Sequence, residues 1–551
     1  MAAAAVVVAH PLEAQTPIPE VILDSEGSAV IVPYYTVNEG WHTLVNVTNT
    51  SPNSLAVKFR LHESRNGRDV LNFSIALGPR DVWTAFIQST ADGRPQLIAT
   101  DRSCTIPLSV RDEGGAIGSE VAYSGDFADH SATDGDPVRT REGYIEILVM
   151  GETAGGGAPP SGSFAGDIAY FAGHIDGEPR DCGIVNDAFD ARTAGFDTRA
   201  GTSEAISGVD SDGMGGTVQT GSGSPIARKG AALVDGSAVS SRGYGPIQSM
   251  RPLKVNTTLV NQTTGRAAGI ESFAVAGYGV GRNLVSAQAF PWSMEPTLAT
   301  GETLWTLTGL PVIAAGTAAS RARNEWTSNA NTGAVSEWVL TFPTKRFEDD
   351  VDTDNIYAAC SAWRNGDTAA GMPDASGFST EPRYDVGDNA PPPTCPDEGF
   401  SPGTFQDNDN GATFPGGTAY AFFDREEGSA LAELDGPGGF AMPPPEFAID
   451  RLFYTTNVIK IGRNVAGDDS VLGSPVARYL ETNYLESDAS TGWLQVSFDG
   501  DAYNPVGLAS DAVPMTGFLY KQRDFGDPTR NFGQATPHSY DRPQLPPATS
   551  D

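Results

Sequence analysis

The chain has 551 residues, 39% of them apolar, and a formal net charge of −34. This length predicts about two to four domains. The acidity excludes nucleic acid and anionic membranes as favoured partners, because both repel a negative surface. Glycine and proline number 63 and 39, so turns and loops are expected to fill much of the chain.

The N-terminus reads "MAAAAVVVAHPLEAQ" and contains an apolar run from Ala2 to Ala9. This run is too short to span a bilayer and has the length of a signal-peptide core. We therefore expect residues 1–15 to be a truncated signal peptide and the protein to be secreted or on the cell surface. The missing basic leader leaves open that the segment is no signal. No other run suggests membrane insertion.

Strand patterns dominate the next 135 residues or so, with every second residue apolar. In "LAVKFRLHE" (55–63), Leu55, Val57 and Phe59 share one side of an extended chain, and Lys58 and Arg60 share the other. The same alternation predicts further strands at 29–37, 41–49, 69–77, 81–88 and 143–150.

Short alternating strands separated by turn residues favour an all-β fold. We expect two or more antiparallel β-sandwich domains, immunoglobulin-like in type, with long Gly/Asp-rich loops. The predicted regions are a sandwich at 16–150, a Gly-rich linker at 151–227, β-rich regions at 228–345 and 417–540 around an acidic disulfide-bearing loop region at 346–416, and a tail at 541–551. The two later β-rich regions are expected to form one or two further sandwiches together.

Four cysteines occur, Cys104, Cys182, Cys360 and Cys395, and none lies in a CxxC pair. This spacing argues against a zinc site. In an exported protein an even number favours disulfides, and of three possible pairings we prefer Cys104–Cys182 and Cys360–Cys395. Four free thiols in a cytosolic protein are the alternative.

The acidic turn "EDDVDTDN" is the best candidate for a metal site. Asp349, Asp350, Asp352 and Asp354 alternate in a loop in a way that can direct several carboxylates at one Ca²⁺ ion. The turn does not complete an EF-hand, and solvated acidic loops are the alternative interpretation. Calcium is the one cofactor that the sequence suggests.

The sequence contains no HExxH, no GxxxxGK[ST] and no paired CxxC motif. Glycosidase chemistry needs two carboxylates beside a cleft, and "DREE" after the apolar "AYAFF" is the most interesting candidate, with Asp424, Glu426 and Glu427. An Arg between carboxylates is more often a structural ion pair. The eight tryptophans can stack on sugars only where they are exposed, and most are expected in the core.

Several phrases, in order along most of the chain, resemble a family of secreted bacterial proteins of unknown function: "VPYYTVNEGWHTLVNVTNTS", "DVWTAFI", "TDRSCTIP", "REGYIEILVMGE", "WVLTFPTKRF" and "DREE". The resemblance implies export, a β-rich structure and a bacterial source. It implies no reaction and no catalytic residues. The Gly- and Asp-rich insertions near 151–227 and 346–416 depart from the family pattern.

Two functions follow from these observations. The first is a non-enzymatic secreted or cell-surface structural protein, of the surface-layer, filament or adhesin type, whose sheet edges allow self-association into a homo-oligomer or polymer. The alternative is a secreted carbohydrate-binding protein or glycoside hydrolase, which predicts a groove lined with exposed tryptophan.

Overall fold

The computed structural model describes about half of the chain. The described residues are 20–22, 26–64, 67, 69–99, 101–106, 108–112, 116–117, 137–153, 168–183, 185, 205–210, 217–219, 244, 247–280, 313, 316–329, 332–343, 367–369, 372–373, 417–424, 429–431, 452, 454–463, 469–475, 477–482, 490–499 and 512–542. The fold is all-β, with several antiparallel sheets, which confirms the predicted class.

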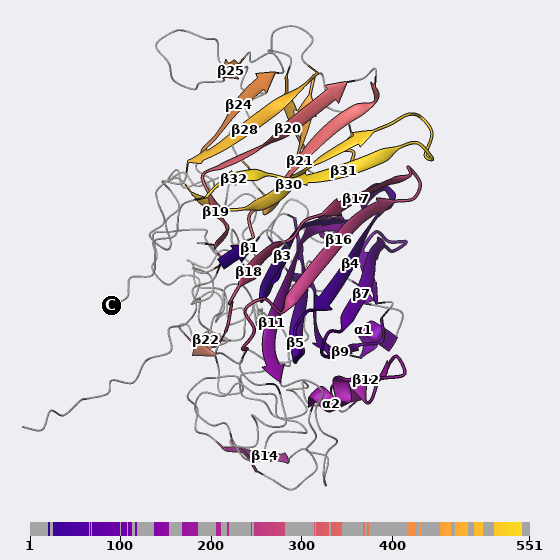
Figure 1. Ribbon diagram of the computed structural model, residues 1–551, viewed down its shortest axis with the longest axis vertical. Coiled ribbons are helices and arrows are strands. Elements are labelled where there is room, and N and C mark those ends of the chain that lie inside the picture. Colours follow the sequence, from indigo (N-terminus) through magenta and orange to yellow (C-terminus); the bar gives the residue numbers. More distant parts are fainter. Residues whose placement is uncertain are drawn as a thin grey trace, which may run out of the picture.

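Two seven-stranded antiparallel sheets form the lower part of the molecule in Figure 1. Sheet A consists, in spatial order, of β1 (Glu20–Ile22), β18 (Phe273–Ala276), β3 (Ala29–Thr36), β11 (Glu142–Thr153), β5 (Ser54–Glu63), β6 (Asp69–Leu77) and β9 (Cys104–Ile106). Sheet B consists of β10 (Ala116–Ile117), β8 (Pro95–Ala99), β7 (Val82–Ser89), β4 (Trp41–Asn49), β16 (Leu253–Asn261) and β17 (Arg266–Ile270), with β2 (Glu26–Gly27) also paired to β16.

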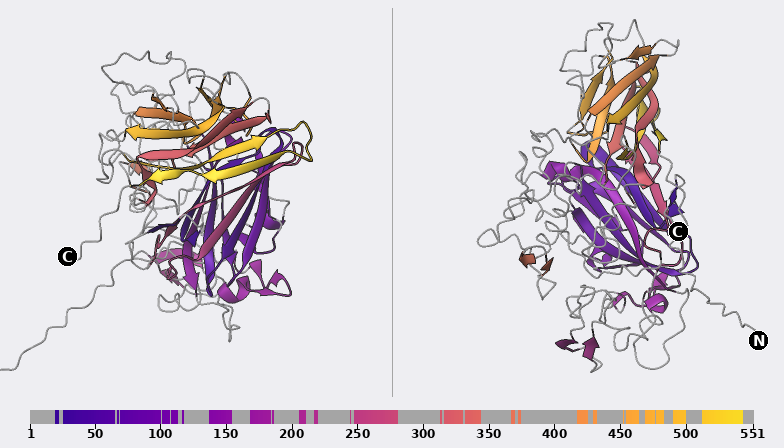
Figure 2. Two further views of the ribbon diagram at one scale, coloured as in Figure 1. Left: turned by 45° about the horizontal axis from the view of Figure 1, so that its top comes forward. Right: turned by 90° about the vertical axis from the view of Figure 1, so that its left-hand side faces the viewer.

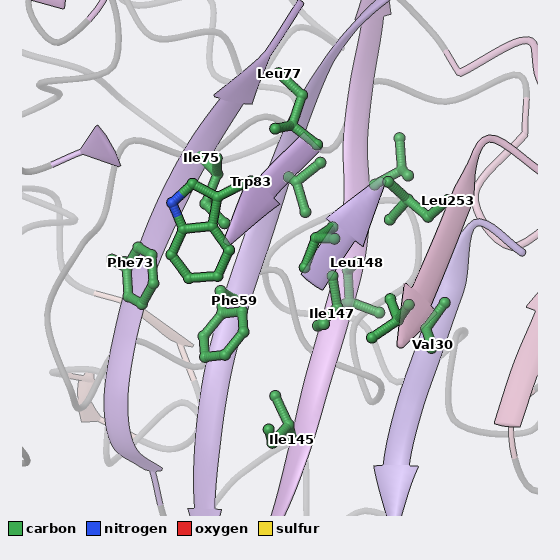
Figure 3. Close-up of a cluster of buried hydrophobic side chains, with 14 of the residues drawn as sticks. Val30, Phe59, Phe73, Ile75, Leu77, Trp83, Ile145, Ile147, Leu148 and Leu253 are labelled. Atoms are coloured by element: carbon green, nitrogen blue, oxygen red, sulfur yellow. The ribbon is translucent and has the colours of Figure 1, made fainter. Parts of the chain in front are cut away.

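Sheets A and B pack face to face around one apolar core. Trp83 of sheet B lies against Phe59 and Phe73 of sheet A, with ring centroids 5.4 and 5.8 Å apart (Figure 3). Phe59 and Phe73 stack on each other at 5.0 Å. The alternation read from the sequence therefore identifies the residues that point into this core.

A ten-stranded sheet forms the upper part of the molecule and folds into two layers. The first layer, here sheet C, consists of β25 (Ser429–Leu431), β24 (Gly417–Asp424), β28 (Thr491–Asp499), β20 (Arg321–Asn329) and β32 (Ser539–Asp541). The second layer, here sheet D, consists of β27 (Arg478–Glu481), β26 (Thr456–Gly462), β21 (Ala334–Thr341), β30 (Thr516–Arg523) and β31 (Phe532–Pro537).

Sheets C and D are joined where β20 turns into β21, and they enclose a second apolar core. Strands β20 and β21 pair only near their turn, at Ser328↔Val335 and Asn329↔Ala334. Trp326 and Phe422 of sheet C meet the side chains of sheet D in this core. All pairs in sheets A to D are antiparallel except β26 with β27.

The remaining elements are short. They are α1 (Ser109–Asp112), α2 (Ile168–Ala172), the 3₁₀ turns Asn38–Gly40 and Pro137–Arg141, and the two-stranded pairs β12 (His174–Ile175) with β13 (Glu178–Pro179), β14 (Ala205–Asp210) with β15 (Thr217–Gln219), β19 (Ala318–Ala319) with β29 (Val513–Pro514), and β22 (Asp367–Ala369) with β23 (Met372–Pro373).

The strand pairing differs from one expectation. Residues 228–345 were expected to combine with 417–540, yet β16 pairs along its whole length with β4 of the N-terminal part. Leu253 and Val255 of β16 are buried in the core between sheets A and B. Pairing with β4 covers an edge that would otherwise remain open, and it buries this alternating strand on its apolar face. The proposed domain boundaries themselves stay a prediction.

A third apolar cluster joins the two halves of the molecule. Sheet D lies across the end of sheets A and B (Figures 1 and 2), and Trp41 meets Tyr520 edge to face at 5.6 Å. Glu337, buried in sheet D, accepts hydrogen bonds from the backbone N–H groups of Val471 at 2.7 Å and Leu472 at 3.0 Å. Burial raises the pKa of the Glu337 carboxyl. Sheet D is therefore covered on both faces, by sheet C on one side and by the end of sheets A and B on the other.

Cys104 of β9 and Cys182 form a disulfide with a sequence separation of 78 residues. This confirms the first predicted pair. The bond ties the edge of sheet A to the segment that follows α2. Cys360 and Cys395 lie outside the described residues, so their predicted pairing stays a prediction.

Candidate functional site

A groove of about 630 Å³ opens between the strands of sheets C and D. Its walls come from β20 and β28 on one side and from β21, β30 and β31 on the other. The residues that line it are Glu325, Trp326, Thr327, Ala334, Thr491, Gly492, Trp493, Lys521, Gln522, Arg523, Phe532 and Gln534. The groove lies where β20 leaves β21, because only the turn end of this hairpin is paired.

Trp493 presents an aromatic face to solvent at the groove. Its side chain is 38% exposed, although an aromatic ring on an alternating strand is usually buried. The ring stacks on Phe423 of the neighbouring strand, with centroids 3.8 Å apart and planes 7° apart. This stacking holds the Trp493 ring in one orientation, so a ligand meets a rigid flat surface.

Gly492 allows this arrangement. A β-carbon at position 492 would collide with the backbone oxygen of Phe423 and would come within 2.9 Å of the Trp326 Nε1 atom. Strand β24 therefore approaches β28 closely enough for Phe423 to support Trp493 only because residue 492 has no side chain.

A second aromatic side chain lies on the opposite wall. Phe532 is 49% exposed, and its strand register places it directly across from Arg523. Phe525, 43% exposed, lies beside it with ring centroids 6.3 Å apart. Three of the large apolar side chains that are exposed in the described residues thus gather at or next to one groove, which is typical of a binding surface.

Charged groups complete the groove. Lys521 Nζ donates to Glu325 Oε2 at 2.5 Å, and the two side chains are 25% and 66% exposed. Arg523, two residues further along β30, is exposed and makes no ion pair with any described residue. The groove therefore combines aromatic faces with one neutralised and one available cation.

Two buried polar atoms on lining residues have no hydrogen-bond partner among the described residues. They are Trp326 Nε1, an obligate donor, and Gln522 Oε1, an acceptor. Leaving a buried polar group unsatisfied costs about 1–3 kcal/mol. Trp326 Nε1 lies next to Gly492 at the groove, where a water molecule or a ligand can complete such a group. Gln522 alternates with Lys521 and Arg523 along β30, so its side chain projects from the opposite face of the strand.

The described tryptophans are of two kinds, buried and exposed. Trp41, Trp83, Trp326 and Trp338 are buried, as the alternation predicts, whereas Trp493 is exposed. Asp424 pairs in register with Gly492, so the backbone of "DREE" begins beside the groove. Glu426 and Glu427 lie outside the described residues, as do the predicted calcium ligands Asp349, Asp350, Asp352 and Asp354.

Sequence reasoning missed the remaining groove residues. Glu325, Arg523 and Phe532 lie on strands far apart in the chain, and no local spacing relates them. One signal was available: "GW" at 492–493 places the smallest residue next to the largest in a strand, which indicates a close backbone approach.

No protein-family model, curated protein or solved structure matches this chain. Among the described residues, no helix has both the length and the apolar character needed to cross a bilayer. The same residues contain no cluster of three or more His, Cys, Asp or Glu side chains placed to hold a metal ion. The geometry of the groove is therefore the observation on which a function can be argued.

Proposed function

We propose that this chain is a secreted, non-enzymatic carbohydrate-binding protein whose groove holds sugar rings against Trp493. The observation that carries the proposal is the exposed Trp493 ring, fixed by its stack on Phe423 within a groove of polar groups. The C–H face of a sugar ring packs on a flat aromatic surface, while its hydroxyl groups need hydrogen-bond partners.

The polar groups of the groove suit such a ligand. Trp326 Nε1 can donate to a sugar oxygen after a small opening of the groove. This contact would satisfy an atom that is otherwise unpartnered among the described residues. A purely apolar ligand would leave this atom without a partner.

Binding is favoured over hydrolysis by the carboxylates of the groove. Glycoside hydrolysis uses two carboxylates on either side of the bond that breaks. Among the described lining residues Glu325 is the one carboxylate, and Lys521 already holds it. The groove thus lacks, within the described residues, the pair that the hydrolase alternative requires.

The test is calorimetric titration of the full chain against a panel of soluble neutral and acidic polysaccharides. Trp493→Ala is expected to weaken binding at least about tenfold, as for an aromatic hot spot worth over 1 kcal/mol. Leu44→Ala is the matched control, because Leu44 is 40% exposed on sheet B, away from the groove. Unchanged affinity in the Trp493 variant, or no binding across the panel, would overturn the proposal. New reducing ends during incubation would favour the hydrolase.

We further propose that each pair of packed sheets is a sandwich domain; the immunoglobulin-like part of that description stays a prediction. Self-association is a separate proposal, supported by edge strands such as β27, whose one partner among the described strands is β26. Sedimentation of the same protein with and without Ca²⁺ tests it. A monomeric profile in both conditions would count against assembly and would leave the binding proposal intact.

A further inference from the structure

The groove holds one cation that no carboxylate neutralises among the described residues. Lys521 is occupied by Glu325, whereas Arg523 is exposed at the same wall without a described ion-pair partner. Lys521 and Arg523 are two residues apart on β30, so both side chains project from the same face of the strand.

An arginine side chain without an ion-pair partner among the described residues is unexpected in so acidic a protein. The chain has 69 acidic and 35 basic residues. Several arginine side chains elsewhere in the described fold are paired, for example Arg323 with Asp541 and Arg139 with Glu63. The guanidinium is planar and can donate two parallel hydrogen bonds to one carboxylate, so an exposed arginine in a groove suits an anionic ligand.

The aromatic groups of the groove limit the kind of anionic ligand that would fit it. Phe532 lies directly opposite Arg523 in the strand register, and Trp493 lines the same groove. A ligand that uses all three groups must carry a flat apolar face and a negative charge on one unit. A uronic acid has this combination, because the C–H groups of its ring form the face and its carboxylate is attached to the ring.

We infer that the groove is specific for an anionic saccharide that contains uronic acid, with Arg523 binding the carboxylate and Trp493 the ring. This inference rests on the proposed carbohydrate-binding function and adds the charge of the ligand. Glu325 limits the affinity, because it neutralises Lys521 and places a negative charge at the groove wall.

The experiment compares two probes that differ at the carboxyl group: an oligogalacturonide, which carries free carboxylates, and its uncharged, fully methyl-esterified form. Both are titrated into the full chain in EDTA, which removes metal bridges, and at 0.15 M salt, where the Debye length is about 8 Å and the distant acidic surface is screened. The acid form is expected to bind roughly tenfold more tightly than the ester, the value of one charge-assisted hydrogen-bonded contact.

Three variants locate the preference. Arg523→Gln is expected to remove the difference between the two probes while retaining binding of the ester. Glu325→Gln is expected to tighten binding of the acid form alone, because it releases Lys521. Arg102→Gln is the charge control; Arg102 is 67% exposed and pairs with Glu178 outside the groove, so its loss should leave the preference unchanged.

The outcomes distinguish this inference from the proposed function. Equal binding of both probes by the parent chain, or a preference that survives Arg523→Gln, overturns the inference and leaves carbohydrate binding standing. Equally tight binding of a poly-glutamate peptide also overturns it, because charge without a ring would then suffice. Absence of binding to either probe and to the wider panel overturns both.

Discussion

Sheets A and B contain strands with the same alternating sequence pattern, but they differ in whether the polar face of each strand is buried or exposed to solvent. In sheet B the alternation appears directly as burial: β4 and β17 switch between buried and more exposed residues along their length. In sheet A, every residue of β5 is buried, and so is every residue of β3. The polar side of "LAVKFRLHE" therefore does not face water.

The buried polar face of sheet A is organised by contacts between ionisable side chains. His62 Nε2 lies 3.1 Å from Glu146 Oε2, and the His62 ring stacks on Tyr144 at 4.6 Å. Arg60 is directly opposite Glu146 in the strand register. Burying a charge is costly unless it is paired and hydrogen-bonded. The comparison teaches that alternation identifies the apolar face of a strand but does not tell whether the polar face is solvated.

Sheets C and D repeat this contrast in the upper half. Strand β30 of sheet D packs Leu519 into one core and Tyr520 into the other. Strand β28 of sheet C buries Leu494 but leaves Trp493 exposed. The candidate ligand groove thus takes its exposed tryptophan from sheet C and its cations from sheet D, and sheet D also holds the two halves together.

Among the predictions that compare buried with solvent-facing polar groups, the largest change in stability is expected from His538. This residue is 4% exposed, and its Nε2 atom lies 3.1 Å from the Val339 carbonyl oxygen. Burial lowers the pKa of His538 from 6.5 to about 3. In the unfolded chain His538 therefore binds its proton first as the pH falls, so its contribution to stability is present above pH 6.5 and is lost between about 6.5 and 3.

Each pH unit within that window changes the unfolding free energy by about 1.4 kcal/mol. Across the whole window from pH 6.5 to 3 the loss amounts to about 5 kcal/mol, of which about 2 kcal/mol falls between pH 6.5 and 5, above the range in which most carboxylates titrate. We expect a flatter profile in His538→Gln. Denaturant unfolding across this pH range measures the slope. His42→Gln, at a half-buried position on the solvent-facing side of β4, is the matched control for the change of histidine to glutamine. Parallel slopes in parent and His538→Gln would contradict the prediction.

Much of the fold was accessible from the sequence because its strands are local patterns. The alternation in 29–37, 41–49 and 69–77 matches β3, β4 and β6 closely. The pairing of β16 with β4 was not accessible, because it joins residues more than 200 positions apart and depends on which edge is open. The Cys104–Cys182 pair was predicted as one of three options, since sequence alone does not fix connectivity.

Only one feature of the groove, an exposed tryptophan, could be predicted from the sequence. An exposed tryptophan was expected of a carbohydrate-binding protein, but the pattern of "TGWLQVSFD" does not reveal that Trp493 is the exposed one. Its exposure depends on Phe423 from another strand, and the available charge of Arg523 depends on Lys521 already occupying Glu325. Such relations arise from tertiary pairing, which no spacing in the chain encodes.

A smaller effect is expected from the buried ion pair at the end of β5 in sheet A. Arg139 Nη2 lies 3.1 Å from Glu63 Oε1, and both side chains are fully buried. Glu63→Gln removes a carboxylate that pairs with Arg139, and breaking a buried ion pair costs about 3 kcal/mol. Denaturant midpoints of the parent and the variant measure this loss. Asn46→Ala, on the exposed face of β4 in sheet B, should change stability by no more than about 0.5 kcal/mol. Equal, small effects in the two variants would mean that this end of β5 is solvated in solution, which would contradict the contrast between sheets A and B at this position.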